Sequence, residues 1–337
     1  MTIASQPPVA VVTPVLNGEE FLAETMDSVQ AQTYPNLVHI VLDNASTDAT
    51  AQIVERYRGA RVPVNSARQP ATVPMARNWN DAVSLVPADT RYFRLLCADD
   101  VLRPNAIESY VRVAERDPEI GIVGCLWRAS GLCGEELPAE REIFDGRDVM
   151  QTYLRREHSG LSGMHALIRC TALSGPQPFY DEALASFDTE VNLRICRYAK
   201  FGFVREELGI WRIHDNSTTN KFATNTFLHE VCWLTLLDRY GPETLDHRQY
   251  LAHRKAFRRH LLRRMLKTYV ADRNAETFQK CLARLAEAGD PATRLDFADA
   301  LAHWALLAAT WRPHTVGRPP RRPPVSFPPP RPPSAPS

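Results

Sequence analysis

Strand-like and helix-like segments alternate along residues 9–127, and this alternation limits the fold more than any other feature of the chain. Val9 to Val15 form an unbroken and mostly β-branched run, which predicts a strand buried on both faces. Because parallel strands need a crossover between them, the alternation predicts an α/β fold with a doubly wound, mainly parallel sheet. Strands are expected at 9–15, 37–43, 62–69, 92–100 and 120–127, and helices at 17–33, 47–57, 73–86 and 105–117.

The pattern changes twice further along the chain. Residues 126–220 are less regular, whereas residues 225–311 are helical in pattern. Within that helical region the expected helix at 253–270 places four large apolar residues on one face: Phe257, Leu261, Met265 and Tyr269. Residues 312–337 are mostly Pro and Arg without any acid, so they cannot bury a core and are expected to be disordered.

Composition excludes several classes of protein. Apolar residues make up 44% of the chain and charged residues 23%, which is ordinary for a globular protein. A net charge of +1 gives no electrostatic footprint for a nucleic-acid partner. The seven Cys form no CxxC pair, which argues against a zinc site or a disulfide framework. The start lacks a signal-peptide pattern, and no run reaches the ~20 apolar residues of a membrane span, so we expect a cytoplasmic protein.

Polar residues gather where the predicted strands end. The segments TPVLNGEE, DNASTD and CADD each follow or close a strand, and Asn17 is available as the N-cap of the first helix. Asp99 and Asp100 come directly after an apolar run, where their mutual repulsion calls for a neighbouring cation. Open α/β sheets bind ligands in the crevice at the carboxyl ends of their strands, so the sequence predicts a ligand site at this edge.

These segments together resemble a known family. The stretch VAVVTPVLNGEEFLAETMDSVQAQTYPNLVHIVLDNASTDAT looks like the opening of a family 2 glycosyltransferase with the GT-A fold. The later motifs ARN, LLCADDVLRP, FDTEVNLR and WRIHDNS occur in the order and spacing of that family, over about residues 8–220. The resemblance implies a nucleotide-sugar-binding half at 1–125 and an acceptor-binding and catalytic half at 126–220. The pattern of the chain adds a helical region at 221–311 and a disordered Pro-rich tail at 312–337.

The resemblance also implies a divalent cation, Mn²⁺ or Mg²⁺, which offsets the charge of the leaving diphosphate. The DxD motif of the family falls on Cys97-Ala98-Asp99, so that Asp99 is expected to be a metal ligand and to contact the nucleotide-sugar. A thiol is a poor ligand for a hard cation, so Cys97 is not expected to coordinate. The structural alternative is that these acids cap the helix after Pro104, a role for which Asp100 is as good a candidate.

Further residues are assigned to the nucleotide-sugar by the same resemblance. Pro14 lies in the first motif, and Asp43 and Asn44 are expected near the base and ribose, with UDP or dTDP as the nucleotide. The alternative for Asp43 and Asn44 is an Asx turn followed by a helix cap. Arg77 is expected to contact the diphosphate or the base, and its alternative is a surface Arg on a helix. Arg212 is expected to pair with phosphate.

Two residues are expected to act beside the donor. Asp188 matches the general base that takes the proton of the acceptor hydroxyl, with Glu190 two positions later and Phe187 where an acid is common. The alternative is that Asp188 only caps the helix that follows. His214 is expected to face the diphosphate or the metal, although a lone His is more often structural.

The resulting hypothesis is an inverting transferase that moves a sugar from a nucleotide-diphospho-sugar to a glycan or lipid-linked acceptor in cell-surface polysaccharide synthesis. Alternatives are a module that binds a nucleotide-sugar without turnover, because acids are replaced at Cys97 and Phe187, and a nucleotidyltransferase, for which TPVLNGEE has too few Gly. The basic helix at 253–269 predicts peripheral contact with the inner face of the cell membrane; its alternative is a solvated or packed helix face.

Overall fold

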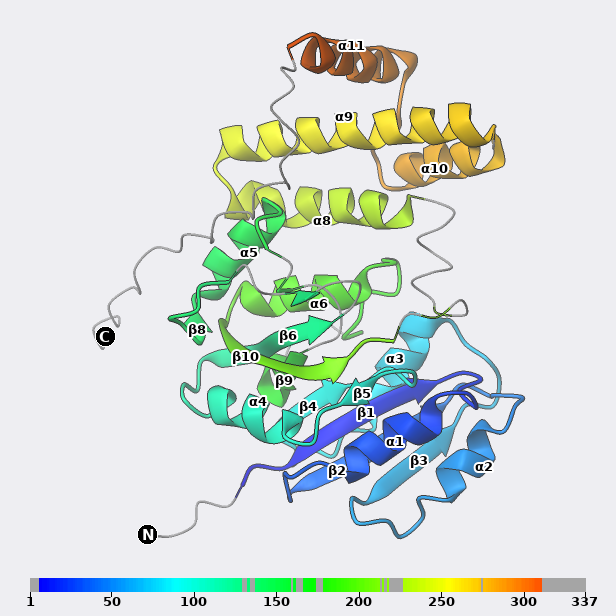
Figure 1. Cartoon of the computed structure of the whole chain (residues 1–337), viewed down its shortest axis with the longest axis vertical. Coiled ribbons are helices and arrows are strands. Elements are labelled where there is room, and N and C mark those ends of the chain that lie inside the picture. Colours follow the sequence, from blue (N-terminus) through cyan, green and yellow to red (C-terminus); the bar gives the residue numbers. More distant parts are fainter. Residues whose placement is uncertain are drawn as a thin grey trace. The chain divides into compact units, whose positions relative to one another are not determined.

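The computed structural model describes residues 6–128, 132–133, 137–158, 160–161, 166–173, 178–212, 214, 217, 227–273 and 275–310. These residues form two compact units, shown in Figure 1. The first unit contains the described residues up to 183 together with 187–212, and the second contains 184–186 and the described residues from 214 to 310. The expected tail at 312–337 lies outside the described residues.

The first unit is built on one mixed sheet. Its strands are β1 (Val9–Val15), β2 (Leu37–Asp43), β3 (Val64–Arg68), β4 (Tyr92–Leu95), β5 (Val101–Leu102), β6 (Ile120–Arg128), β7 (Leu132–Cys133), β8 (Ile143–Phe144), β9 (Ala166–Arg169) and β10 (Lys200–Ile210). The main order is β3-β2-β1-β4-β9-β6-β10-β5, with β3, β2, β1 and β4 parallel. Strand β9 lies antiparallel between β4 and β6, whereas β6 and β10 are parallel.

Helices alternate with the strands of the first unit and fill the second. They are α1 (Leu22–Gln30), α2 (Thr50–Glu55), α3 (Met75–Ser84), α4 (Ala106–Ala114), α5 (Gly146–Leu154) and α6 (Phe187–Cys196) in the first unit, and α8 (Leu228–Thr244), α9 (His247–Asp272), α10 (Ala275–Glu287) and α11 (Arg294–Thr310) in the second. The expected α/β class, the mainly parallel sheet and the helical C-terminal region are confirmed.

The sheet core explains why the strands are so apolar. Every residue of β1 is buried, because helices cover this part of the sheet. In Figure 1, β1 lies at the centre of the parallel strands, between β2 and β4. The chain leaves β1 toward β2 and β3 and later returns to the other side as β4, so the strand order reverses between β1 and β4. The predicted ligand edge therefore coincides with a topological switch point.

Two details of the sequence interpretation change. Asn17 is not the N-cap of α1, which begins at Leu22 after Phe21. Instead Asn17 has a left-handed backbone (φ 52°), donates its N–H to Ser46 Oγ at 2.8 Å and accepts the Thr47 N–H at 2.9 Å. These bonds join the loops after β1 and β2, which local helix signals cannot reveal.

The second detail concerns segment limits and the basic helix. The expected division at residue 125 falls inside β6, so that the two halves of the first unit share one continuous sheet.

In α9, Phe257, Leu261 and Met265 are buried as expected, but Tyr269 is half exposed and packs on Phe278 with ring centroids 5.0 Å apart. None of the helices in the described part of the chain is long and apolar enough to cross a bilayer.

Candidate functional site

The loop after β4 brings the acidic motif together at the switch point. One ligand atom each from Cys97, Asp99 and Asp100 lies within 4.8 Å of the others. Helix α1 holds the loop in place, because Thr25 Oγ1 lies 2.9 Å from the Ala98 carbonyl oxygen and 2.8 Å from that of Asp100. The side chains of the motif are therefore fixed by contacts between elements distant in sequence.

Asp100 is a buried carboxyl and not a helix cap. The residue before α4 is Asn105, whereas Asp100 Oδ1 accepts the backbone N–H of Arg212 at 3.1 Å. The N-cap alternative for Asp100 is therefore wrong. Burial, and next the charge of Asp99, raise the pKa of Asp100 to about 7. Such a carboxyl stays partly protonated near neutral pH unless a cation approaches.

Arg94 supplies a buried positive charge next to this loop, and the sequence analysis did not identify it. The residue lies in β4 and is almost fully buried, with its guanidinium 5.9 Å from the centre of the Tyr110 ring. Its charge lowers the pKa of both Cys97 and Asp100, against the larger upward effect of burial. An Arg inside the apolar run of a central strand was the signal in the sequence, because a buried Arg needs partners.

Asp188 lies in the first turn of α6 and is electrostatically coupled to the acidic loop. Burial raises the pKa of the Cys97 thiol well above its usual range, and the charges of Asp100, Asp99 and Asp188 raise it further. The charge of Asp188 also adds to burial in raising the pKa of Tyr180. Asp188 Oδ1 accepts the Thr189 N–H at 2.7 Å, and because α6 begins at Phe187, Asp188 lies inside the helix and not at its N-cap.

Aromatic packing positions α6 and explains Phe187. The Phe187 ring lies edge-on to Trp79 of α3 at 4.9 Å and to Tyr180 at 5.5 Å. The Asn80 amide donates to the Tyr180 carbonyl at 3.0 Å and accepts its N–H at 2.7 Å. Helix α3 thus anchors the segment that leads into Asp188, and an acid in place of Phe187 would be buried among rings.

The proposed nucleotide residues at the end of β2 are fixed by local bonds. Asp43 is buried, accepts the Ser46 N–H at 2.8 Å and pairs with Arg68 of β3. Asn44 uses both functions of its amide on Val73, donating to the carbonyl and accepting the N–H, each at 2.9 Å. The turn alternative therefore describes Asp43, while Asn44 fixes the segment before α3.

The other predicted residues are placed as follows. Pro14 is buried in β1 opposite Leu42. Arg77 points from α3 to Asp81 at 3.0 Å and is largely exposed, which is the arrangement of the surface alternative. Arg212 pairs with Glu24 at 2.6 Å.

His214 belongs to the second unit, and each unit is described by itself. It is half-buried, and its carbonyl accepts the Ser217 N–H at 2.9 Å. Whether it joins the acidic loop stays a prediction.

The acidic loop fits a hard divalent cation. Asp99 and Asp100 offer carboxylate oxygens close together, and burial, followed by the charge of Asp99, raises the pKa of Asp100. Oxygen ligands of this kind suit Mg²⁺ or Mn²⁺. Because its raised pKa keeps the Cys97 thiol protonated at neutral pH, Cys97 is a still poorer ligand than its softness alone implies.

Comparisons with known proteins agree with this geometry. The family model described as glycosyl transferase family 2 matches residues 10–175. An uncharacterized glycosyltransferase of Rickettsia typhi is 26% identical over 249 residues, which cover 71% of this chain and 74% of that protein. The S. aureus TarS 1–349 complex with UDP-GlcNAc has a TM-score of 0.61 at 14% identity, covering 88% of this chain and 87% of that one. A Pyrobaculum calidifontis mannosyltransferase in complex with GDP-Man and Mn²⁺ gives 0.53 at 16% identity, covering 90% and 81%.

The order of the sheet and the acids clustered at its switch point, together with the structural likeness to TarS, are those of the GT-A fold. The structural likeness, at identities of 14% and 16%, carries the fold alone. Together with the family model and the sequence relatives, it shows that the chain belongs to glycosyl transferase family 2.

Proposed function

We propose that this glycosyltransferase inverts the anomeric centre as it moves a sugar from a nucleotide-diphospho-sugar to a hydroxyl of a glycan or lipid-linked acceptor. UDP or dTDP is the proposed nucleotide, in keeping with the UDP and UDP-GlcNAc complexes of the TarS structures. The GDP-Man complex of the Pyrobaculum enzyme makes GDP the competitor to test. Cell-surface polysaccharide synthesis is the proposed setting, as the family resemblance implies.

One observation supports the reaction: the charge of Asp188 acts on the Cys97 thiol, so the proposed base lies within electrostatic reach of the acidic loop. In the proposed step the acceptor oxygen forms a bond to the anomeric carbon while the bond from that carbon to the diphosphate breaks. The hydroxyl proton passes to the Asp188 carboxylate. Glu190 is buried and paired with Arg194 at 3.4 Å, which favours Asp188 over Glu190 as the base.

The donor is proposed to be held by residues from several strand ends. Asp43, positioned by Arg68, is proposed to accept a hydrogen bond from the base. Arg77 and Arg212 are proposed to exchange their partners Asp81 and Glu24 for the diphosphate; surface pairs of this kind contribute only ~0–1 kcal/mol, so the exchange costs little. Asn44 acts indirectly by holding Val73.

A divalent cation is proposed at Asp99, with Asp100 beside it and His214 as a further candidate ligand. When bound, such a cation supplies Lewis-acid stabilisation to the departing diphosphate. The residues of the chain hold the carboxylates ready for it, because Thr25 and the Arg212 N–H fix the backbone and one Asp100 oxygen.

The test is transfer and donor hydrolysis with UDP-, dTDP- and GDP-sugars in the presence of Mn²⁺, comparing wild type with Asp188→Asn and Asp99→Asn. Loss of the base should lower kcat on the order of 10²–10⁴-fold while binding of the nucleotide is retained. Asp99→Asn should abolish the increase in transfer rate that Mn²⁺ causes in the wild type. Asp89→Asn, an exposed acid of the same unit, is the matched control and should leave turnover unchanged.

Three outcomes would contradict the proposal. Unchanged turnover in Asp188→Asn would exclude the base, and retention of anomeric configuration in the product would exclude the single displacement. Calorimetric binding of a nucleotide-sugar by the wild type, with no release of nucleotide over all acceptors tried, would favour the alternative of a binding module.

Peripheral contact with the inner face of the cell membrane is proposed as well, because a lipid-linked acceptor is held there. The sequence interpretation assigned this contact to the basic residues of 253–269. Several of those basic residues form ion pairs inside the second unit. Another surface of this unit is therefore the better candidate for membrane contact.

A further inference from the structure

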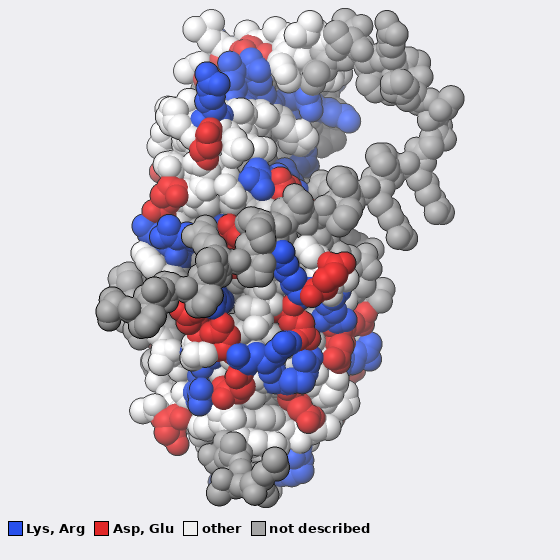
Figure 2. Space-filling model, turned by 90° about the vertical axis from the view of Figure 1, so that its left-hand side faces the viewer, with Lys and Arg blue, Asp and Glu red and all other residues white. Residues whose placement is uncertain are grey.

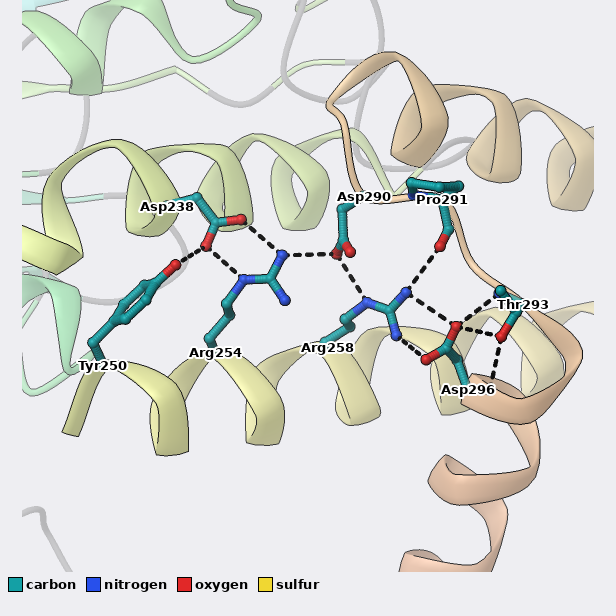
Figure 3. A network of polar contacts seen from close by, with 8 residues as sticks. All are labelled: Asp238, Tyr250, Arg254, Arg258, Asp290, Pro291, Thr293 and Asp296. Atoms are coloured by element: carbon teal, nitrogen blue, oxygen red, sulfur yellow. Dashed lines mark hydrogen bonds and ion pairs between the residues drawn. The ribbon is translucent and has the colours of Figure 1, made fainter. Parts of the chain in front are cut away.

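The buried side of α9 uses its cations internally. Figure 3 shows Arg254 and Arg258 turned toward acids of the neighbouring segments. Arg254 pairs with Asp238 at 2.8 Å and with Asp290 at 3.3 Å, and Arg258 pairs with Asp290 at 2.9 Å and Asp296 at 2.6 Å. These arginines hold the helices of the unit together and are not a surface patch.

Helix α11 packs on the core of its unit through Ala300 and Phe297, and both of its acids pair with arginines of α9. Asp296 faces Arg258 of α9, and Asp299 pairs with Arg259 of α9 at 2.5 Å. The large apolar side chains of the same helix are exposed to solvent: Leu295 80%, Leu306 61%, Trp304 53% and Leu301 45%. A surface helix of a globular protein normally keeps its large apolar side chains on the stripe that faces the core.

Apart from Arg294 and Asp299, the exposed residues of 294–306 are apolar, and Asp299 is paired with Arg259. Ala298, Ala302 and Ala305 are exposed as well, and the spacing of three or four positions from Leu295 through these alanines to Leu306 keeps them on one side of the helix. From 300 to 310 the sequence contains no Lys, Arg, Asp or Glu. We call this set of residues, with Leu301 and Trp304, the α11 apolar face. An apolar patch of this kind on a protein surface marks an interaction site.

The charges around the α11 apolar face are basic. Arg294 opens the helix, Arg259 lies beside Asp299, and the charge of Lys255 acts on Asp299 too. Over residues 227–310, Lys and Arg outnumber Asp and Glu by 13 to 10, and the sequence after 311 adds five Arg without an acid. Figure 2 shows the Lys and Arg of the second unit gathered in a band next to uncharged surface.

We propose that the α11 apolar face docks on an anionic lipid surface. Leu295, Leu301, Trp304 and Leu306 insert at the level of the headgroups, while the basic residues beside them contact acidic lipids. Trp suits this boundary, because its ring is apolar and its N–H is polar. A second copy of the chain is the poorer occupant, since a twofold contact through this face would bring the same basic residues together. The inference sharpens the proposed membrane contact and does not depend on the transfer reaction.

The test is co-sedimentation of the full chain with vesicles of phosphatidylcholine alone or with about 30% phosphatidylglycerol, at low and high salt. We expect binding to the anionic vesicles, weakened by salt, and at least tenfold weaker partition for the double variant Leu301→Gln/Leu306→Gln. Leu85→Gln, an exposed Leu of the first unit (43%), is the matched control and should bind as the wild type does. Transfer to a soluble acceptor should be unchanged in both variants, which separates docking from catalysis.

Insertion is measured directly with brominated lipids, which quench nearby Trp. Quenching that is largely lost in Trp304→Phe would support the proposal even if the Leu variants folded poorly. Three results would overturn it: no binding to anionic vesicles, equal binding to neutral vesicles at all salt concentrations, or a dimer in solution that Leu301→Gln/Leu306→Gln dissociates without any effect of lipid. The last result would assign the face to a second copy.

Discussion

At the scale of single residues, hydrogen-bond chemistry explains the amide side chain at position 44. Asn44 holds the Val73 backbone through a donor and an acceptor at once. An ionised Asp has no donor, so it would lose the bond to the Val73 carbonyl and place negative charge beside that oxygen. The Asn at this position is therefore tied to the position of the segment before α3.

Asn44→Asp tests this at the residue scale. We expect a loss of about 1–3 kcal/mol in the free energy of unfolding, because a buried carbonyl is left without its donor. We also expect a higher KM for the donor with a smaller change in kcat, because the segment before α3 is loosened. Urea denaturation and hydrogen exchange of residues 69–74 measure both effects. Asn36→Asp, which alters an exposed amide, is the control; an equal loss there would refute the argument.

His39 predicts the pH dependence of stability. It is fully buried between β1 and β2, with Nε2 2.9 Å from Thr13 Oγ1, and burial lowers its pKa to about 3. Below its ordinary pKa of 6.5 the unfolded chain binds a proton that the folded chain does not, so stability falls as the pH falls from 6.5 toward 3. Between pH 6.5 and 5 the loss should be about 2 kcal/mol. Denaturation of His39→Gln over this range should show a flatter profile; an unchanged slope would exclude His39 as the cause.

At the scale of elements, α9 joins the helical unit through charge pairs as well as through its apolar face. Arg258 is mostly buried and lies between Asp290, before α11, and Asp296, in its first turn. Replacing Arg258 would remove its charge from both carboxylates, and Asp290 would keep only its longer contact to Arg254 at 3.3 Å. Removing one partner of a buried network costs more than the pair itself contributes, because the remaining charge stays desolvated.

Arg258→Met should therefore lower the free energy of unfolding of the helical unit by about 1–3 kcal/mol. This is less than the loss of a fully buried pair would cost, because Arg258 is partly exposed. Combining it with Asp296→Asn in a double-mutant cycle should show non-additivity. Chemical denaturation followed by circular dichroism is the measurement. Lys280→Met breaks an exposed pair with Glu276 in α10 and is the control, so its denaturation midpoint should equal that of the wild type. A loss of stability as large as that of Arg258→Met would show that burial of the pair does not explain the effect.

At the scale of the whole molecule, the site exists only where the strand ends of the sheet meet. The loops after β1, β2 and β4 and the start of α6 come from distant parts of the chain. A ligand that binds this assembled edge, and not the unfolded chain, stabilises the fold by mass action.

UDP together with Mn²⁺ should accordingly raise the Tm by a few degrees, since ligand at a hundred times its Kd contributes about 2.7 kcal/mol. The part of the shift that requires Mn²⁺ should vanish in Asp99→Asn and persist in Asp89→Asn. Thermal-shift titration with UDP, dTDP and GDP, each with and without Mn²⁺, is the measurement. A larger Tm shift with GDP than with UDP or dTDP would show that GDP is the nucleotide. A Tm shift of Asp99→Asn that still requires Mn²⁺ would show that Asp99 is not the metal ligand.

The sequence by itself determined the α/β class, the order of strands and helices through residue 127 apart from the short β5, and the helical C-terminal region, because hydrophobic periodicity and β-branched runs are local properties. It also placed the acidic motif of Asp99 and Asp100 at a strand end. Tertiary structure alone decided how each polar residue is used. Asp100 became a buried acceptor for Arg212, Phe187 became a packing residue against Trp79, and Arg254 and Arg258 of α9 turned inward. Burial and partners from distant segments set these outcomes, and no local pattern contains either.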